Sequence, residues 1–351
     1  MKKISILILA LTMSFAATAQ DIHFSQFYMA PLNLNPALTG VMNCSQRIAG
    51  NYRNQWASVL RDKAFQTANV AYDTKIPVGR YDYIGLGGSL WGDKAGSLNY
   101  HTNQLSLDFS YAKKMGGYRK KASYLVMGAE IGLAQRGLNT ADARWGSQNN
   151  NGVFDPTIPS NENLFGRNNF MFADVSAGLL WFSVLDENNN FYIGGAYDHI
   201  NRANQSFTTQ GQANSKFFAL NSKFTIHAGG ELGMNDRISL LPGIVTFLQG
   251  PYMQVNGGTS MRFLLGGSKR STEAIQFGAW ARIANKVDGG VLMDALILST
   301  RFDYSQFSIG FSYDLNTSSL QAASRSNGGF EFSLQYKVCG NERRNVYCPN
   351  F

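Results

Sequence analysis

Apolar and polar residues alternate along most of this chain with a period of two. In the segment 328–338, for example, Phe330, Phe332 and Leu334 are separated by polar side chains. Successive side chains of a β-strand point to opposite faces of a sheet, so this period predicts strands rather than helices. The second set is polar or very small in most segments, as expected if one face meets lipid and the other a water-filled interior.

Fourteen segments carry this pattern, and an even number of strands is expected for a single-chain bacterial barrel. No apolar stretch of membrane-spanning helical length occurs after residue 20. The sequence therefore predicts an all-β fold, a transmembrane antiparallel outer-membrane β-barrel of about 14 strands. The predicted strands are 45–56, 64–74, 82–92, 99–113, 122–136, 168–182, 189–199, 217–231, 236–248, 252–265, 274–283, 288–300, 304–315 and 328–338.

The lengths of the connections favour this barrel over a soluble β-sandwich. Bacterial barrels have short periplasmic turns and longer outer loops, and both chain ends lie in the periplasm. With the N-terminus placed there, the three longest connections, 137–167, 200–216 and 316–327, all become outer loops. A sandwich gives no reason for such sorting, and no internal repeat indicates a propeller. The polar loop 137–167 is a candidate partner-binding element, and an inert surface loop fits its composition equally well.

Composition and charge fit an exported β protein. The chain is 13% aromatic and only 15% charged, which suits many strands joined by turns and is shared by soluble secreted β-sandwiches. The formal net charge of +8 becomes +6 without Lys2 and Lys3. We expect no nucleic-acid partner, because the basic cluster is explained by a solvated turn. That cluster is Lys113, Lys114, Arg119, Lys120 and Lys121.

The first residues have the pattern of a secretory signal peptide. Lys2 and Lys3 precede the apolar run 4–15, and small residues follow at 17–19. Cleavage would leave a mature chain that begins near Gln20 or Asp21. The predicted organisation is a signal peptide at 1–19, an N-terminal periplasmic segment at 20–43, the barrel at 44–338 and a C-terminal periplasmic tail at 339–351.

The three cysteines of the chain can oxidise in an exported protein. Cys44 precedes the first predicted strand and Cys339 follows the last, so these two would be neighbours in a closed barrel. A Cys44–Cys339 or Cys44–Cys348 bridge would hold the closure seam together. A Cys339–Cys348 bridge would instead close a small loop in the tail. All three pairings remain open from the sequence.

The segment 21–40 contains an FSQ…NPA…G motif, a YRNQW strand follows at 52–56, and the chain closes with CPNF at 348–351. These two motifs and the ending resemble the PorP/SprF family of Bacteroidetes. The motif residues that we take as candidate functional residues are Phe24, Ser25, Gln26, Asn35, Pro36, Tyr52, Arg53, Asn54, Gln55 and Trp56.

The resemblance implies an outer-membrane barrel of the type IX secretion system. Such a barrel would receive and anchor secreted cargo at the cell surface, namely adhesin-type proteins with a C-terminal sorting domain. Its partners would be outer-membrane lipid, the cargo's C-terminal domain and other secretion components. The alternative is a passive or FadL-like transporter of small solutes, since fourteen strands enclose enough space for a channel.

The residues themselves add expectations about the two motifs. Pro31 and Pro36 prevent a regular helix or central strand, so the first segment should fold as a turn-rich plug or cap at the periplasmic mouth. Arg53 and Gln55 would share one strand face, with Asn54 and Trp56 on the other. Trp56 fits an interfacial girdle better than a binding role, although both are open.

No catalytic, cofactor or metal site is predicted. The four histidines His23, His101, His199 and His227 lack metal-ligand spacing, and no nucleophile elbow occurs. The pair Asp198-His199 could belong to a hydrolytic site, but a polar pair at the end of a strand is commonplace. We therefore expect a protein that is not an enzyme.

Overall fold

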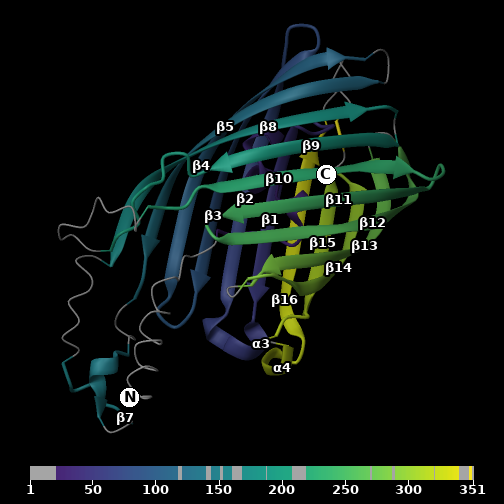
Figure 1. The fold of residues 1–351 in the computed structure, drawn as a ribbon. Coiled ribbons are helices and arrows are strands. Elements are labelled where there is room, and N and C mark those ends of the chain that lie inside the picture. Colours follow the sequence, from purple (N-terminus) through teal and green to yellow (C-terminus); the bar gives the residue numbers. More distant parts are fainter. Residues whose placement is uncertain are drawn as a thin grey trace.

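The protein is described by a computed structural model, in which one chain forms a closed cylinder (Figure 1). The structure describes residues 21–117, 121–139, 144–150, 153–159, 168–186, 188–207, 219–268, 271–286, 289–319, 321–339 and 348–349. The predicted signal peptide and most of the predicted tail lie outside these residues.

Fourteen antiparallel strands make the barrel, and each pairs with its neighbours in the chain until the last closes on the first. The predicted fold class is thus confirmed, and each predicted strand corresponds to an observed one. The strands are β1 (Gln46–Gln55), β2 (Phe65–Val78), β3 (Asp82–Ala95), β4 (Tyr100–Gly116), β5 (Ala122–Gly137), β8 (Asn169–Val184), β9 (Asn189–Asp198), β10 (Lys223–Gly233), β11 (Ile238–Gln249), β12 (Tyr252–Ser268), β13 (Ser271–Asn285), β14 (Val291–Ser305), β15 (Phe307–Asn316) and β16 (Asn327–Val338).

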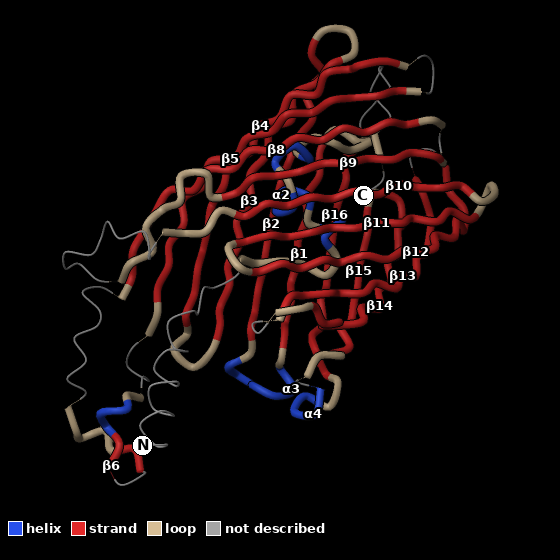
Figure 2. Tube along the Cα trace, in the orientation of Figure 1, coloured by secondary structure: helices blue, strands red, loops and turns tan. Residues whose placement is uncertain are grey.

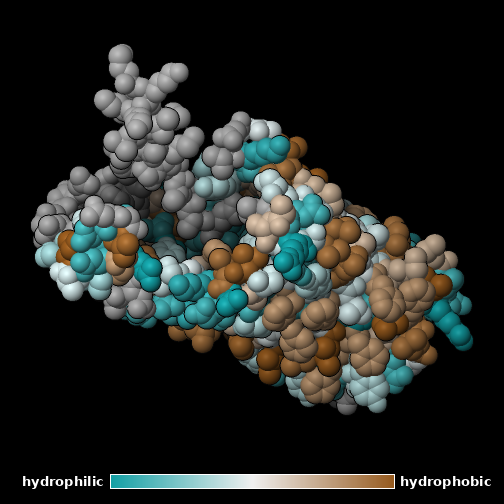
Figure 3. Space-filling view, turned by 90° about the horizontal axis from the view of Figure 1, so that it is seen from below, coloured by the Kyte–Doolittle hydropathy of each residue, from teal (hydrophilic) through white to brown (hydrophobic). Residues whose placement is uncertain are grey.

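The alternation places apolar side chains on the outer surface of the barrel. On β4, Leu105 and Leu107 are 57% and 64% exposed, whereas Ser106 and Asp108, which alternate with them, are buried. Figure 3 shows apolar side chains gathered over one flank of the barrel. An apolar exterior of this kind is what a barrel presents to lipid. Among the helices of the described residues, none has the length and apolar character needed to cross a membrane.

The short elements lie in the N-terminal segment and in the long connections. The former are η1 (Phe27–Met29), α2 (Pro31–Leu34) and η2 (Pro36–Leu38). The latter are α3 (Ala57–Leu60), η3 (Arg61–Lys63), η4 (Gly146–Gln148), β6 (Asn149–Asn150), β7 (Val153–Phe154) and α4 (Gln321–Ser324). We call the end of the barrel with these connections the long-loop end, and the opposite end the short-turn end. The orientation of the barrel in the membrane, with the short turns in the periplasm, stays a prediction.

A disulfide at the short-turn end joins the two strands that close the barrel. β1 pairs with β16 over its full length, from Gln46 opposite Val338 to Gln55 opposite Gly329. Cys44 and Cys339 flank this ladder and are bonded, with their Cα atoms 4.3 Å apart. Of the three pairings left open by the sequence, the structure contains Cys44–Cys339.

Candidate functional site

Residues 21–43, called the plug from here on, run through the lumen from one end of the barrel to the other. At the long-loop end, the backbone N–H of Asp21 donates to Oε1 of Gln249, the last residue of β11, at 2.9 Å. At the short-turn end, Nζ of Lys75 donates to the carbonyl of Met42 at 3.0 Å. Figure 2 shows α2 within the ring of strands. The segment thus extends far beyond the predicted cap at one mouth, because inward side chains of the strands offer its backbone partners along the whole path.

Proline and asparagine shape the plug into short turns. Pro31 begins α2 and Pro36 begins η2, where the missing N–H of proline costs nothing. Oδ1 of Asn35 accepts from the N–H of Ala37 at 2.8 Å and caps η2. Oγ1 of Thr39 then donates to the carbonyl of Pro36 at 2.8 Å. The plug therefore satisfies part of its own backbone polarity before it meets the barrel.

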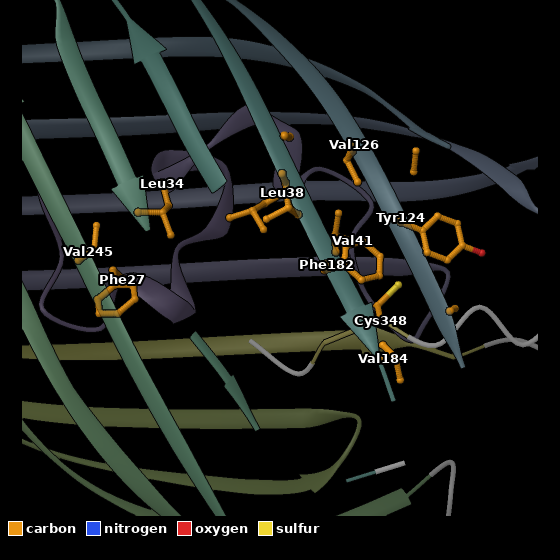
Figure 4. Packing of buried hydrophobic residues seen from close by; sticks show 14 of the residues in the cluster. Phe27, Leu34, Leu38, Val41, Tyr124, Val126, Phe182, Val184, Val245 and Cys348 are labelled. Atoms are coloured by element: carbon orange, nitrogen blue, oxygen red, sulfur yellow. The ribbon is translucent and has the colours of Figure 1, made fainter. Parts of the chain in front are cut away.

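An apolar core joins the plug to the barrel wall near the short-turn end. Leu38 and Val41 are fully buried and pack in one cluster with inward-facing residues such as Tyr124 and Phe182 (Figure 4). Tyr83 belongs to the same cluster. The rings of Tyr124 and Phe182 stack with centroids 5.2 Å apart. These contacts replace the water-filled interior that the alternation suggested. Burial of this apolar surface stabilises the plug in the lumen.

Glycines of the wall make room for the plug backbone. A Cβ atom at Gly128 of β5 would overlap the backbone of Ala37, and one at Gly178 of β8 would overlap the side chain of Asn35. In the space left by Gly178, Nδ2 of Asn35 donates to the carbonyl of Leu179 at 3.1 Å. Such close approach is possible only without a side chain. The wall is thus shaped to the plug.

A charged cluster binds the plug near the long-loop end. Oγ of Ser25 donates to both carboxylate oxygens of Asp314 at 2.9 Å and accepts from Nη2 of Arg282 at 2.6 Å. Asp314 also pairs with Arg282 at 2.8 Å and with Arg53 at 3.1 Å. Glu331 accepts from the backbone N–H of Ser25 at 2.7 Å. We call Ser25, Arg53, Arg282, Asp314 and Glu331 the tip cluster; all five side chains are buried.

A second ion pair binds the plug near the short-turn end. Nε and Nη2 of Arg47 contact the two carboxylate oxygens of Asp73 at 2.9 and 2.7 Å. The same carboxylate accepts from the N–H of Gly40 at 2.7 Å, and Nη2 of Arg47 donates to the carbonyl of Leu38 at 3.3 Å. Gly40 has a φ of 73°, which favours glycine at this turn. A bidentate arginine–carboxylate pair of this kind has a defined geometry and positions the plug backbone.

His199 and Lys223 surround Asp21 at the long-loop end of the plug. His199, just after β9, contacts Asp21 through Nε2 and Asp174 through Nδ1, the latter at 2.9 Å. Nζ of Lys223 lies 3.5 Å from Oδ2 of Asp21. Burial opposes the charged form of His199, but Asp21 and Asp174 outweigh it and raise the pKa of His199 to about 10. Burial likewise opposes ionisation of Asp21, yet His199 and Lys223 hold its pKa well below the usual range.

The structure divides the candidate motif residues into two groups. Phe24, Ser25, Gln26, Asn35, Pro36 and Arg53 lie in the lumen, in the plug or against it. Tyr52 faces outward, where its hydroxyl accepts from Nδ2 of Asn54 at 3.4 Å. Gln55 ends β1, and Trp56, with a φ of 66°, directly precedes α3 at the long-loop end. The YRNQW motif therefore reaches the lumen network through Arg53, which contacts His23 and Asp314.

Sequence reasoning missed the wall residues that complete the lumen network. Arg282, Asp314 and Glu331 occupy inward positions of predicted strands, and their charge in such positions was the available signal. Of the pair Asp198-His199, the ring of His199 contacts Asp174 and Asp21, and Oδ2 of Asp198 lies 3.4 Å from Nζ of Lys223. Within the described ranges, no group of three or more His, Cys, Asp or Glu residues is placed to hold a metal ion.

Part of the C-terminal tail docks at the short-turn end. The N–H of Cys348 donates to Oδ1 of Asn43 at 2.7 Å, and its Sγ lies 4.0 Å from the hydroxyl of Tyr83. Cys348 is buried in the apolar cluster that contains Leu38 and Val41. The tail motif thus contacts the plug through its first residue.

Comparison with known proteins identifies the family. The family model described as type IX secretion system membrane protein PorP/SprF matches residues 16–336. No curated protein sequence matches the chain. Among solved structures, CdiB from Escherichia coli aligns with a TM-score of 0.46 and 9% identity over 82% of this chain and 63% of CdiB, so the chain spans less than two thirds of that protein.

Two hydrocarbon transport proteins align to a similar degree. The Ralstonia pickettii toluene transporter TbuX has a TM-score of 0.42 and 10% identity over 88% of this chain and 94% of TbuX. The deltaS2 mutant of the TodX monoaromatic hydrocarbon channel has a TM-score of 0.46 and 10% identity over 89% of this chain and 94% of TodX. The family match rests on the sequence of nearly the whole barrel: this chain belongs to the PorP/SprF family of type IX secretion system membrane proteins, with the fold of an outer-membrane barrel.

Proposed function

We propose that this barrel receives secreted cargo and anchors it at the cell surface, as a non-catalytic component of the type IX secretion system. The cargo would be adhesin-type proteins that carry a C-terminal sorting domain. The observation that carries the proposal is the plug, which contacts the wall from Asp21 at one end of the lumen to Met42 at the other. A barrel filled in this way supports a docking platform better than an open conduit.

The long-loop end is the surface that we assign to cargo. It carries α3, η4, the β6–β7 hairpin and α4, whereas the opposite end carries short turns (Figure 1). Within the loop 137–167, Val153 of the hairpin is 69% exposed, and the guanidinium of Arg144 lies 5.0 Å from the ring centroid of Phe154. Exposed apolar and polar groups on a rigid scaffold suit protein recognition.

Delivery to the outer membrane would begin with the leader at residues 1–19. The mature chain would then start near Gln20 or Asp21, beside the contact between Asp21 and Gln249. N-terminal sequencing of protein purified from the native outer membrane checks this step. A mature chain that still began at Met1 would contradict it.

Deletion in the native host tests the proposed role. We expect the null strain to lose surface display of at least one type IX cargo, and the wild-type gene to restore it. A variant in which residues 144–159 are replaced by a short glycine-serine turn should fold but fail to restore display. A matched variant shortened at 57–63 controls for loop shortening in general. Normal export and display of every cargo in the null strain would defeat the proposal.

A gentle detergent pull-down from the native membrane identifies the partners. We expect cargo C-terminal domains and other secretion components to copurify with the wild-type barrel. The variant replaced at 144–159 should retain the secretion components and lose the cargo, if periplasmic turns contact the former and outer loops the latter. Copurification of neither class would contradict the platform role.

A further inference from the structure

Basic side chains gather around two neighbouring turns of the short-turn end, which join β2 to β3 and β4 to β5. Arg80 lies in the first turn, and Lys113 and Lys114 lie near the end of β4. Lys121 lies directly before β5. A solvated turn is enough to explain such a cluster from the sequence alone. The neighbours of each cation in the structure decide whether it does more.

The charge of Lys113 is balanced by a carboxylate. Nζ of Lys113 lies 2.8 Å from Oδ2 of Asp82, and the hydroxyl of Tyr111 donates to the same oxygen at 2.9 Å. The backbone N–H of Lys114 donates to Oδ1 of Asp82 at 3.0 Å. Both oxygens of this carboxylate are thus engaged by β4, and neither contacts the side-chain ammonium of Lys114.

Arg80 and Lys114 instead lie on one exposed aromatic ring. The guanidinium carbon of Arg80 is 5.2 Å from the ring centroid of Tyr81, and Nζ of Lys114 is 4.3 Å from it. Tyr81 is 49% exposed. Within the described ranges, neither cation pairs with a carboxylate. We call Arg80, Tyr81 and Lys114 the rim site. Two cations beside one ring, without a counter-charge, suit a phosphate group.

The outer face of the neighbouring strands places the rim site at the edge of the lipid-facing belt. Toward the short-turn end of β4, the outward residues change from Leu107 through Tyr111 to Lys113. On the outer face of β8, the indole N–H of Trp181 donates to Oγ of Ser123 at 3.0 Å. Tyrosine and tryptophan with a bonded polar tip are typical of the boundary between hydrocarbon and head groups. The rim site lies just beyond this boundary, at the level of the head groups.

Apolar side chains continue from the rim site along the outer wall. Ile76 of β2 lies opposite Ile84 of β3 in the ladder. Ile76 and Leu86 are both exposed on the outer surface. A ligand with a negative head and an apolar body therefore matches this part of the barrel from the turn to the wall.

We propose that the rim site binds an anionic phospholipid of the surrounding membrane, such as phosphatidylglycerol. Its phosphate contacts Arg80 and Lys114, and its acyl chains lie along Ile76 and Leu86. A lipid fits better than an acidic protein, because the site continues directly into the apolar exterior. A zwitterionic lipid fits less well, because its own ammonium would be repelled by the two cations. The site does not depend on the proposed cargo role.

Native mass spectrometry of the intact protein in detergent tests the site by competition. The barrel is offered equal amounts of phosphatidylglycerol and phosphatidylethanolamine with identical acyl chains. We expect the wild-type protein to retain phosphatidylglycerol in roughly tenfold excess. Equal retention of the two lipids by the wild-type protein would overturn the proposal.

A matched pair of double variants locates the site. Arg80→Gln with Lys114→Gln should bring the retention of the two lipids close to parity. Arg61→Gln with Lys63→Gln removes the same charge from exposed residues of η3 at the long-loop end and should leave the preference unchanged. Heat-modifiable mobility on a gel checks that each variant is folded, and the wild-type competition stands even if one is not. A preference that survives in the first variant, or falls equally in both, would also overturn the proposal.

Discussion

Gly128 on β5 lies directly against the backbone of Ala37 in the plug, so closely that a Cβ atom at position 128 would overlap it. This contact shows that plug and wall are shaped to each other. The plug also supplies the buried partners of the wall's charges. We therefore regard it as part of the folded barrel rather than as an attached peptide.

Enlarging Gly128 should destabilise the barrel by displacing the plug. We expect Gly128→Val to lower the free energy of unfolding by about 3 kcal/mol, because the obstructing atoms belong to backbone that cannot swing aside. Unfolding in increasing urea measures the change, with the folded fraction read from the heat-modifiable mobility of the barrel on a gel. Gly116→Val on β4 is the control, since a Cβ there meets nothing within 4 Å. Equal stability of the two variants would refute the shaped fit.

Neutralising Asp314 should remove a carboxylate that two buried cations share. Arg53 and Arg282 both pair with this carboxylate, and Ser25 of the plug donates to it. We expect Asp314→Asn to cost about 3–5 kcal/mol and to expose the plug to protease. The exposed Asp62→Asn serves as the matched control. Protease resistance equal to wild type would show that the tip cluster does not hold the plug.

The contact between Asp21 and His199 should make stability depend on pH. The pKa of His199 is raised from 6.5 to about 10, so its contribution is complete below pH 6.5 and is lost as the pH rises toward 10. The pKa of Asp21 is lowered, so its contribution is complete above 3.8 and is lost as the pH falls further.

We therefore expect the stability difference between wild type and His199→Gln to be greatest between pH 3.8 and 6.5. It should shrink between pH 6.5 and 10. Thermal unfolding across this range in detergent measures it, with His101→Gln as the control at another histidine. A difference that stayed constant from pH 5 to pH 10 would rule out the charged pair.

Removal of the seam disulfide should weaken the closure of the barrel. Cys44 and Cys339 are 295 positions apart in sequence, and the bond restricts the unfolded chain. The double substitution of both by alanine should cost about 2–4 kcal/mol. Alkylation without reduction should leave Cys44 and Cys339 unmodified in the wild-type protein. Modification of either, or unchanged stability of the double variant, would count against a structural bridge.

The strands could be predicted from sequence because one physical constraint governs them. A strand with lipid outside must alternate, and segments such as Leu105–Asp108 on β4 carry that signal in four residues. The sequence allowed the bond between Cys44 and Cys339 but did not single it out. Barrel closure brings these two residues together, but Cys348 lies near Cys339 in sequence and could also have paired with Cys44.

The plug and its partners could not be predicted in the same way. Residues 21–43 have no period, because short turns around Pro31 and Pro36 follow the shape of the lumen rather than a repeating face. Their partners come from strands up to 306 positions away, as in the contact of Ser25 with Glu331. A single sequence identifies inward polar positions but not which plug atom each one meets.

The plug fills the lumen of a closed barrel. Conductance of the purified protein in planar lipid bilayers tests this most directly. We expect the intact protein to be electrically silent, and a variant lacking residues 21–41 to conduct if it folds. Steady open conductance from the intact, folded protein would contradict the claim and would favour a passive channel.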